Sequence, residues 1–177
     1  MEYKLNNVIN EFNKPYLSIW NGIVMGGGVG LSLYGNSRMV SEVAKFAMPE
    51  TAIGFFPDVG ASYFLSKLDN GIGLFLGLTG KVCNAKDLMV FGLATHYLPQ
   101  KLIGKAVENY ILGEEFNQED QLPAMHSEIL SHKNFIKDTF IGNIQSIVNK
   151  LKNSSLPFAK KIYGHLLTRC PMSLAVT

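Results

Sequence analysis

The segment KFAMPETAIGFFPDVGASYF, residues 45–64, contains two carboxylates in almost wholly apolar surroundings. Glu50 and Asp58 are the only acids between Lys45 and Leu68, and each of them directly follows a proline. An unpaired charge in an apolar site is costly, so carboxylates in such a setting are paired, protonated or functional. The rest of the sequence has to decide which of these applies.

The composition is that of one folded domain of ordinary size. The 177 residues are 47% hydrophobic and 17% charged, which supplies a core and argues against disorder. With 16 basic and 14 acidic residues, the chain has no electrostatic footprint for nucleic acid. Cys83 and Cys170 lie far apart, which predicts reduced, buried thiols, and the histidines lack metal-site spacing, so no metal is expected.

An uncharged stretch at residues 15–37 is long enough to span a bilayer, and Gly22, Gly26 and Gly30 in it have GxxxG spacing. Against a membrane helix stand Asn21 and a triple glycine in mid-span, since each glycine costs a water-soluble helix interior about 1 kcal/mol relative to alanine. A buried strand that ends in a glycine turn fits these residues better, so no membrane span is expected. The first residues show neither a signal peptide nor a transit peptide.

The order of predicted elements places strands among helices first and helices alone afterwards. We expect an amphipathic helix over 2–13, an apolar strand over 16–25, a glycine turn and short helix over 26–37, one or two short strands over 38–49, and helices over 58–68, 71–80 and 84–92, the last capped by Asn84 and stopped by Gly92. From Lys101 onward the pattern is helical, with breaks near Gly113, Leu122–Pro123, Ser154–Pro157 and Pro171. This order predicts an α/β core over 1–100 with a helical region over 101–177 packed on it.

The segment MGGGVG, residues 25–30, ends a predicted strand and opens a predicted helix. Glycines there let a ligand approach the backbone, and the first helical N–H groups point outward with the positive end of the helix dipole. Such a turn can bind an anion or stabilise an oxyanion. It is not a dinucleotide fingerprint, because Leu33 stands where the last glycine should be. The alternative, that the glycines only permit tight strand–helix packing, stays open.

Three segments together carry a more specific signal: residues 14–35 (KPYLSIWNGIVMGGGVGLSLYG), residues 46–68 (FAMPETAIGFFPDVGASYFLSKL) and residues 92–99 (GLATHYLP). With them the chain resembles the crotonase (enoyl-CoA hydratase/isomerase) superfamily over nearly its whole length. It is most similar to the branch that hydrolyses the thioester of 3-hydroxyisobutyryl-CoA in valine breakdown. The resemblance implies a spiral of β-β-α units followed by a helical C-terminal region.

The resemblance also implies a site. Gly27 matches the position whose backbone N–H is one of two donors to the thioester oxygen, Glu50 matches an active-site glutamate, and Asp58 matches the aspartate of the hydrolase branch. Gly30 stands where hydratases carry a second catalytic glutamate, which argues against hydration chemistry. The implied partner is an acyl-CoA substrate, with CoA as part of the substrate and no separate cofactor, and the implied location is the mitochondrion.

The roles of the two acids stay open at this point. Glu50 could attack the carbonyl as a nucleophile or activate a water as a general base, and Asp58 could orient either one or exchange protons with it. In a structural role instead, Glu50 would be a turn carboxylate satisfied by backbone N–H groups, and Asp58 would cap a helix. Two close carboxylates in an apolar pocket would have pKa values pushed apart. Phe55 and Phe56 are candidates for the acyl pocket.

Complete family members carry, before the part that matches Met1, a strand and a loop that supplies the other oxyanion donor, and their last helix extends past Thr177. We therefore keep a second hypothesis, a truncated relative without turnover, and a third, a hydratase or isomerase. A missing sheet neighbour would leave an apolar strand edge open to association, so self-association is left open.

Overall fold

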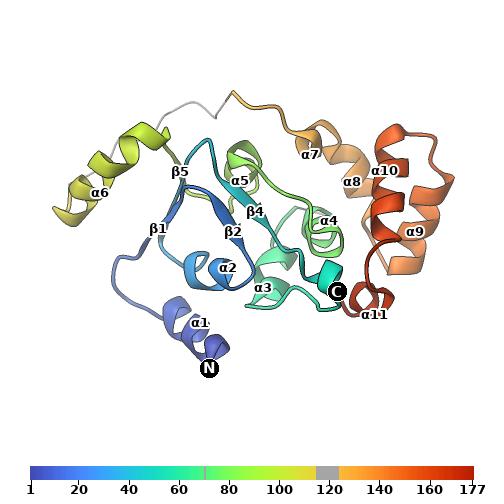
Figure 1. Ribbon diagram of the computed structural model, residues 1–177, viewed down its shortest axis with the longest axis horizontal. Coiled ribbons are helices and arrows are strands. Elements are labelled where there is room, and N and C mark those ends of the chain that lie inside the picture. The colour runs from blue at the N-terminus through green and yellow to red at the C-terminus, as the bar shows by residue number, and fades with distance from the viewer. Residues whose placement is uncertain (70, 115–123) are drawn as a thin grey trace. The chain divides into compact units, whose positions relative to one another are not determined.

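The computed structural model describes residues 1–69, 71–114 and 124–177 (Figure 1). Their contacts form two compact units: the first unit holds residues 1–46 and 83–127, and the second unit holds residues 47–82 and 128–177. The boundary predicted after residue 100 follows the order of the predicted strands and helices. A grouping by contacts does not test that order, so the boundary stays a prediction. The helix break predicted near Leu122 and Pro123 lies outside the described residues.

A parallel sheet forms the centre of the first unit. It contains β1 (Leu17–Trp20), β3 (Ser37–Val40) and β5 (His96–Tyr97) in the order β1-β3-β5, and β2 (Ile23–Met25) pairs separately with β4 (Lys45–Ala47). Leu17 lies opposite Ser37, and Met39 lies opposite His96. Parallel strands buried in a sheet read as apolar runs, and Met39 and Val40 are both fully buried.

The single strand predicted over 16–25 is wrong, because the structure has two strands there. Asn21 and Gly22 separate β1 from β2. Gly22 has a φ of +155°, which side chains rarely allow, and Asn21 Oδ1 accepts a hydrogen bond from Ser41 Oγ at 2.6 Å. Trp20, at the end of β1, is 1% exposed and stacks on Phe46 with ring centroids 5.6 Å apart. The turn therefore moves the chain into a second sheet just before the glycine cluster.

The helices of the first unit are α1 (Glu2–Asn10), α2 (Gly27–Ser32), α5 (Ala85–Val90) and α6 (Ile103–Ile111), with a 3-10 turn, η2, at Gln100–Leu102. The predicted N-cap of α5 is confirmed, because the Asn84 side chain accepts the Asp87 N–H at 3.1 Å and Asp87 accepts the Asn84 N–H at 2.9 Å. Helix α1 lies beside α2 (Figure 1). The buried face of α1 was predicted to be apolar, but its one buried residue is Asn6.

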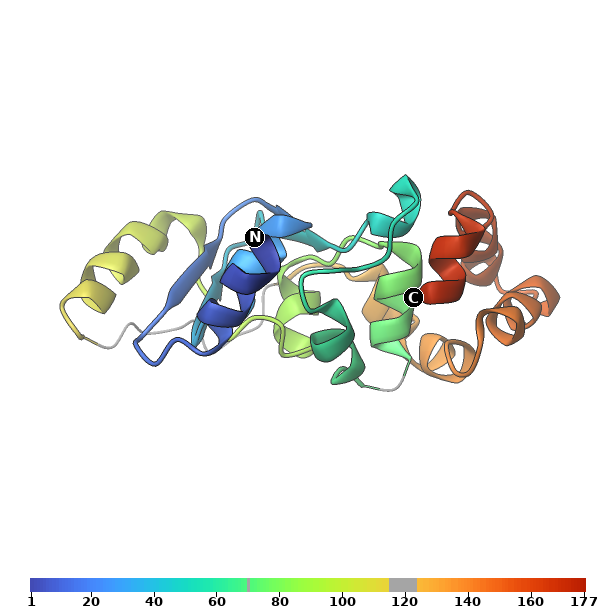
Figure 2. The same ribbon diagram turned by 90° about the horizontal axis from the view of Figure 1, so that it is seen from below.

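The second unit is helical and packs around α4 (Ile72–Thr79). Its other elements are η1 (Glu50–Ile53), α3 (Ala61–Ser66), α7 (Glu128–Ser131), α8 (Lys133–Thr139), α9 (Ile144–Asn153), α10 (Pro157–Leu166) and α11 (Pro171–Val176). Helix α4 contacts α3, α8 and α10, and Figure 2 shows α9 and α10, in orange and red, side by side. Phe75 on α4 is fully buried, with the ring centroid of Phe140 at 5.0 Å. A helix apolar on every face belongs in a core, as α4 does.

The helix predicted to start at Asp58 starts at Ala61 instead. Val59 has a φ of +46° and Gly60 a φ of +84°, and two successive residues in the left-handed region cannot belong to a right-handed helix. The Asp58 carbonyl accepts the Ala61 N–H at 2.7 Å, which closes the turn before the helix. Asp58 therefore lies in a loop.

Two further expectations concern a membrane-spanning helix and the two cysteine thiols. Across residues 1–69, 71–114 and 124–177, none of the helices has the length and apolar character needed to cross a membrane. Cys83 is buried as predicted, whereas Cys170 is half-buried, so the prediction of a buried thiol is wrong for Cys170. Cys170 precedes Pro171 at the start of α11, where the chain runs near the surface.

Candidate active site

Glu50 is a buried carboxylate at the first position of η1, directly after Pro49. It is 5% exposed, and its Oε2 atom has no hydrogen-bond partner among the residues that the structure describes. Burial raises the pKa of Glu50; a hydrogen bond from its own backbone N–H lowers this pKa in part, and the charge of Asp58 raises it. The structural role, a carboxylate satisfied by backbone groups, therefore fails for Oε2. Glu50 has the environment of a group that takes up a proton readily.

Asp58 is half-buried, and it lies close enough to Glu50 for its charge to act on that carboxylate. The fold thus brings together the two acids that stand eight residues apart in the sequence. The alternative role of Asp58 as the N-cap residue is wrong, because the N-cap of α3 is Gly60. With the cap excluded, the position of Asp58 near Glu50 is what requires an explanation.

Val59 holds the backbone beside Asp58 in a strained conformation. A β-branched residue with a φ of +46° is an outlier, and such strain costs about 1–3 kcal/mol. The Val59 side chain is 2% exposed, so packing in the second unit fixes the strained residue. Strain of this kind gathers at functional sites, where it fixes the orientation of a neighbouring group. Here the neighbouring group is the Asp58 carboxyl.

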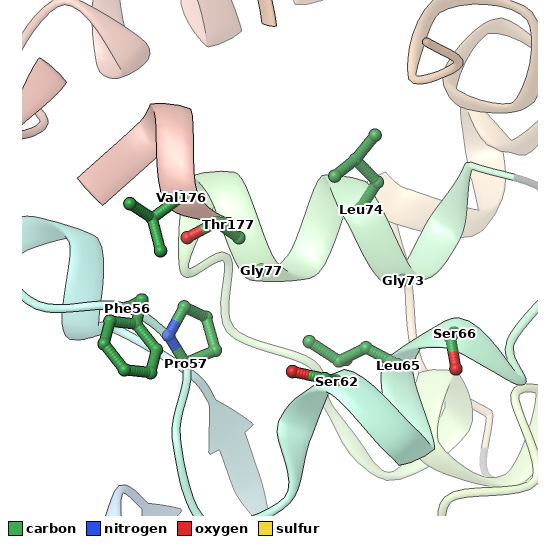
Figure 3. A pocket seen from close by; sticks show the side chains of 10 residues that line it. All are labelled: Phe56, Pro57, Ser62, Leu65, Ser66, Gly73, Leu74, Gly77, Val176 and Thr177. Atoms are coloured by element: carbon green, nitrogen blue, oxygen red, sulfur yellow. The ribbon is translucent and has the colours of Figure 1, made fainter. Parts of the chain in front are cut away.

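A cavity of about 330 Å³ lies in the second unit next to the segment that leads into Asp58. Figure 3 shows that its walls come from α3, α4, the end of α11 and the loop before α3: Phe56, Pro57, Ser62, Leu65, Ser66, Gly73, Leu74, Gly77, Val176 and Thr177. The walls combine apolar side chains with three hydroxyls. Phe56 lines this cavity and stacks on Phe55 with ring centroids 4.4 Å apart. Its use as an acyl pocket stays a prediction.

The glycine turn of the first unit has the expected form. Gly26 is the N-cap of α2 with φ +54° and ψ −128°, a conformation that suits glycine, and Gly27 is the exposed first residue of that helix. The first N–H groups of a helix have no acceptor within the helix, so Gly27 can present its N–H to a ligand. Gly30 is buried in α2, where it contributes no side chain. Gly27 belongs to the first unit, whereas Glu50 and Asp58 belong to the second.

Glu2 lies next to the glycine turn, and the sequence analysis did not identify it as part of the candidate site. Its Oε1 atom lies 2.7 Å from the point that a Cβ on Gly27 would occupy. Asn6, one turn further along α1, is 6% exposed, and neither of its amide atoms has a partner within the described part of the chain. The available signal was the pair of polar residues four apart, which share one face of a helix. The Glu2 carboxylate therefore lies against the glycine turn, and a Cβ at residue 27 would require this flexible side chain to shift.

Within the described ranges, no three or more His, Cys, Asp or Glu side chains come together in a metal-binding arrangement.

Comparison with known proteins shows the family of the chain. The model of the enoyl-CoA hydratase/isomerase family matches residues 1–177. The chain is 39% identical to the mitochondrial 3-hydroxyisobutyryl-CoA hydrolase of Gallus gallus and 36% identical to that of Homo sapiens, each over 190 residues that cover 99% of this chain and 49% of the relative. It therefore spans about half the length of the curated relatives it matches.

Solved structures show the same likeness. An enoyl-CoA hydratase from Rhodobacter sphaeroides 2.4.1 is 31% identical with a TM-score of 0.92, over 99% of this chain and 52% of that one. A carnitinyl-CoA dehydratase from Mycobacterium thermoresistibile is 36% identical with a TM-score of 0.87, over 99% of this chain and 53% of that one. The crotonase-type fold expected from the glycine turn and the Glu50–Asp58 segment is confirmed. The chain belongs to the enoyl-CoA hydratase/isomerase family.

Proposed function

We propose that this chain carries active-site residues of an acyl-CoA thioester hydrolase that converts 3-hydroxyisobutyryl-CoA and water into 3-hydroxyisobutyrate and CoA. The observation that carries the proposal is the buried Glu50, whose Oε2 no described residue bonds, beside the charge of Asp58. Relatives that bear this hydrolase name, at 36–39% identity, support the choice of substrate. These relatives are named as mitochondrial proteins, which supports a mitochondrial location as part of the same proposal.

The reaction needs a base, a hydrogen-bond donor to the oxyanion and a proton for the departing sulfur. In the general-base route, Glu50 takes a proton from water as the water oxygen bonds to the thioester carbon. The carbonyl oxygen becomes an oxyanion, the C–S bond then breaks, and the proton held by Glu50 passes to the CoA thiolate. A base whose pKa lies nearer the working pH is more effective, and burial raises the pKa of Glu50 in that direction.

In the nucleophilic route, a Glu50 oxygen bonds to the thioester carbon, CoA leaves, and water hydrolyses the resulting anhydride. A single turnover in ¹⁸O-labelled water distinguishes the two routes. The general-base route places ¹⁸O in the product acid. Attack of water on the Glu50 side of an anhydride instead leaves ¹⁸O in the Glu50 carboxylate, where mass spectrometry of the peptide detects it.

Asp58 and Gly27 also have roles in the proposed mechanism. The charge of Asp58 strengthens Glu50 as a base by raising its pKa. The family resemblance gives the Gly27 N–H to the oxyanion, and loss of one such donor typically costs about 100- to 1000-fold in rate. The reaction as written consumes only water and the thioester, so we propose no separate cofactor. Gly30 brings no second carboxylate, which disfavours a hydratase that needs two glutamates.

The test is release of free thiol from 3-hydroxyisobutyryl-CoA by the purified 177-residue chain. Glu50→Gln is expected to abolish turnover and to leave binding of the CoA ester largely intact, whereas Glu108→Gln, the same exchange at an exposed site on α6, is expected to leave turnover unchanged. Near-normal turnover by Glu50→Gln would show that Glu50 has no such role. A folded wild-type chain without turnover would favour the inactive relative, and hydration of an enoyl-CoA instead would favour the hydratase.

A further inference from the structure

We propose that Thr51 is a positioning residue for Glu50, because its side chain and its carbonyl fix η1 between the end of α4 and the start of α11. The proposal deepens the hydrolase function and rests on it for the role of Glu50. Thr51 directly follows Glu50 in η1 and is fully buried. It was not among the residues that the sequence singled out.

Two hydrogen bonds join Thr51 to separate helices of the second unit. The Thr51 hydroxyl donates to the Leu78 carbonyl near the end of α4 at 3.1 Å. The Thr51 carbonyl accepts the Cys170 N–H, at the start of α11, at 3.1 Å. One residue thus bonds to segments 27 positions later and 119 positions later (170 − 51) in the sequence. Both bonds are made by the residue that directly follows Glu50.

The end of α4 also touches the residues that precede Glu50. Gly80, the C-cap of α4, has a φ of +62°, and a Cβ built on it would lie 3.0 Å from the Met48 carbonyl oxygen and 3.0 Å from the Pro49 Cα. Glycine is required there by both its conformation and the close approach. The backbone on each side of Glu50 is therefore held against α4, before it by Gly80 and after it by Thr51.

The rest of η1 offers little else to hold it. It is one 3-10 turn of four residues, and such turns have poorer hydrogen-bond geometry than α-helices. Ala52 is exposed, and Ile53 is 81% exposed. Without the Thr51 hydroxyl the turn can move away from α4 and admit water to the Glu50 carboxylate. Glu50 would then lose the burial that raises its pKa.

The experiment measures the pKa of the Glu50 carboxyl in the 177-residue chain by carbon-detected NMR, with the Glu50 signal identified by its absence in Glu50→Gln. Thr51→Val, which keeps the shape and removes the hydroxyl, is expected to lower this pKa toward the ordinary value, and Thr51→Ser is expected to restore it. Thr79→Val is the matched control, because the Thr79 hydroxyl is equally buried but has no bond to η1: it donates to the Phe75 carbonyl at 2.6 Å and accepts the Lys81 N–H at 3.2 Å. Thr51→Ala replaces Thr51→Val if the latter does not fold.

A pKa lowered by Thr51→Val and not by Thr79→Val supports the proposal. An unchanged pKa, or an equal fall in both variants, overturns it. The second readout is thiol release, in which Thr51→Val is expected to reduce kcat about ten- to hundredfold with little change in KM, as misplacing a catalytic group does. An inactive wild-type chain would overturn the hydrolase function alone, since the NMR comparison decides the role of Thr51 without turnover.

Discussion

We expect Glu50→Gln to abolish turnover. We also expect its free energy of unfolding, relative to that of the wild-type chain, to be higher at neutral pH than at acid pH. The reason is that the folded chain keeps this carboxyl buried and beside Asp58, so folding favours its protonated form. Glutamine has nearly the same shape and never ionises. The variant therefore escapes a cost that the wild-type chain incurs whenever Glu50 is charged.

The pH window follows from the direction of the shift. Below the ordinary glutamate value of 4.5, the carboxyl is protonated in both the folded and the unfolded chain and contributes nothing. Between that value and the raised value in the folded chain, the folded state holds more protons, so stability falls as pH rises. Above the raised value the full cost is present, about 1.4 kcal/mol for each pKa unit of the shift.

The measurement is urea unfolding of the wild-type chain, Glu50→Gln and Glu108→Gln at pH 4 and pH 8. An uncharged amide at residue 50 also leaves a buried polar group, which costs about 1–3 kcal/mol at any pH. Only the change in the stability difference between the two pH values is therefore informative. We expect the free energy of unfolding of Glu50→Gln to rise relative to that of the wild-type chain between pH 4 and pH 8. The value for Glu108→Gln should stay within about 0.5 kcal/mol of the wild-type value at both pH values.

A stability difference between Glu50→Gln and the wild-type chain that stays constant with pH would refute the reasoning, because it would mean that Glu50 titrates normally in the fold. Glu50 would then be too well solvated to act as the buried base that the mechanism requires. A gain in stability at pH 8 together with lost turnover would instead identify a residue that the fold keeps at a cost to stability.

Three further outcomes are expected. Asp58→Asn removes the charge that raises the pKa of Glu50, so the acid limb of kcat/KM for whatever activity remains should move to lower pH; a limb at the same pH would contradict the coupling. Glu128, whose pKa hydrogen bonds from Lys161 and Lys81 lower to about 2, contributes stability above its ordinary value that is lost as pH falls toward 2. Because this carboxylate is about a third exposed, Glu128→Gln should cost only about 1 kcal/mol at pH 7 in urea unfolding, and less at pH 2, where the carboxylate of the folded chain is about half protonated. Gly73→Ala would place a Cβ 1.9 Å from a backbone oxygen of α3 and should lower stability by about 1–3 kcal/mol, measured as a fall in Tm.

The sequence was most informative where local rules govern the chain. The glycine turn that opens α2, the N-cap at Asn84 and the helix over 71–80 were each predicted from short-range patterns, and the structure has them, the last as α4. The prediction failed where a single residue departs from its usual conformation. Gly22 divides one apolar run into two strands, and Val59 in the left-handed region delays α3 by three residues. The first departure has a signature that the prediction passed over, because the Asn21–Gly22 dipeptide is typical of a turn. The second has none, since valine is among the residues least expected in the left-handed region.

The approach of Glu2 to Gly27 escaped prediction for a different reason. The pattern of α1 suggested a helix that packs through apolar side chains, but Leu5 and Val8 are 48% and 59% exposed, whereas Asn6 is buried. Hydrophobic periodicity identifies the face of a helix that avoids water, and it assumes that this face is the packed one. In α1 the packed face is polar, so only the three-dimensional contact with α2 reveals it.

The ten residues from Glu50 to Val59 contain two features that each reduce stability. One is the carboxylate oxygen of Glu50, which is buried and has no bonding partner in the described chain, and the other is the left-handed Val59. A loop with only a structural role would be served as well by a neutral residue at position 50 and a glycine at position 59. Natural sequences depart from local rules chiefly where function requires it. Both departures act on the acids of a single pair, and Thr51 fixes the first of these acids through bonds to two helices. Under the proposed function, the strain at Val59 and the unbonded Glu50 oxygen have one explanation, a carboxylate held ready to accept a proton.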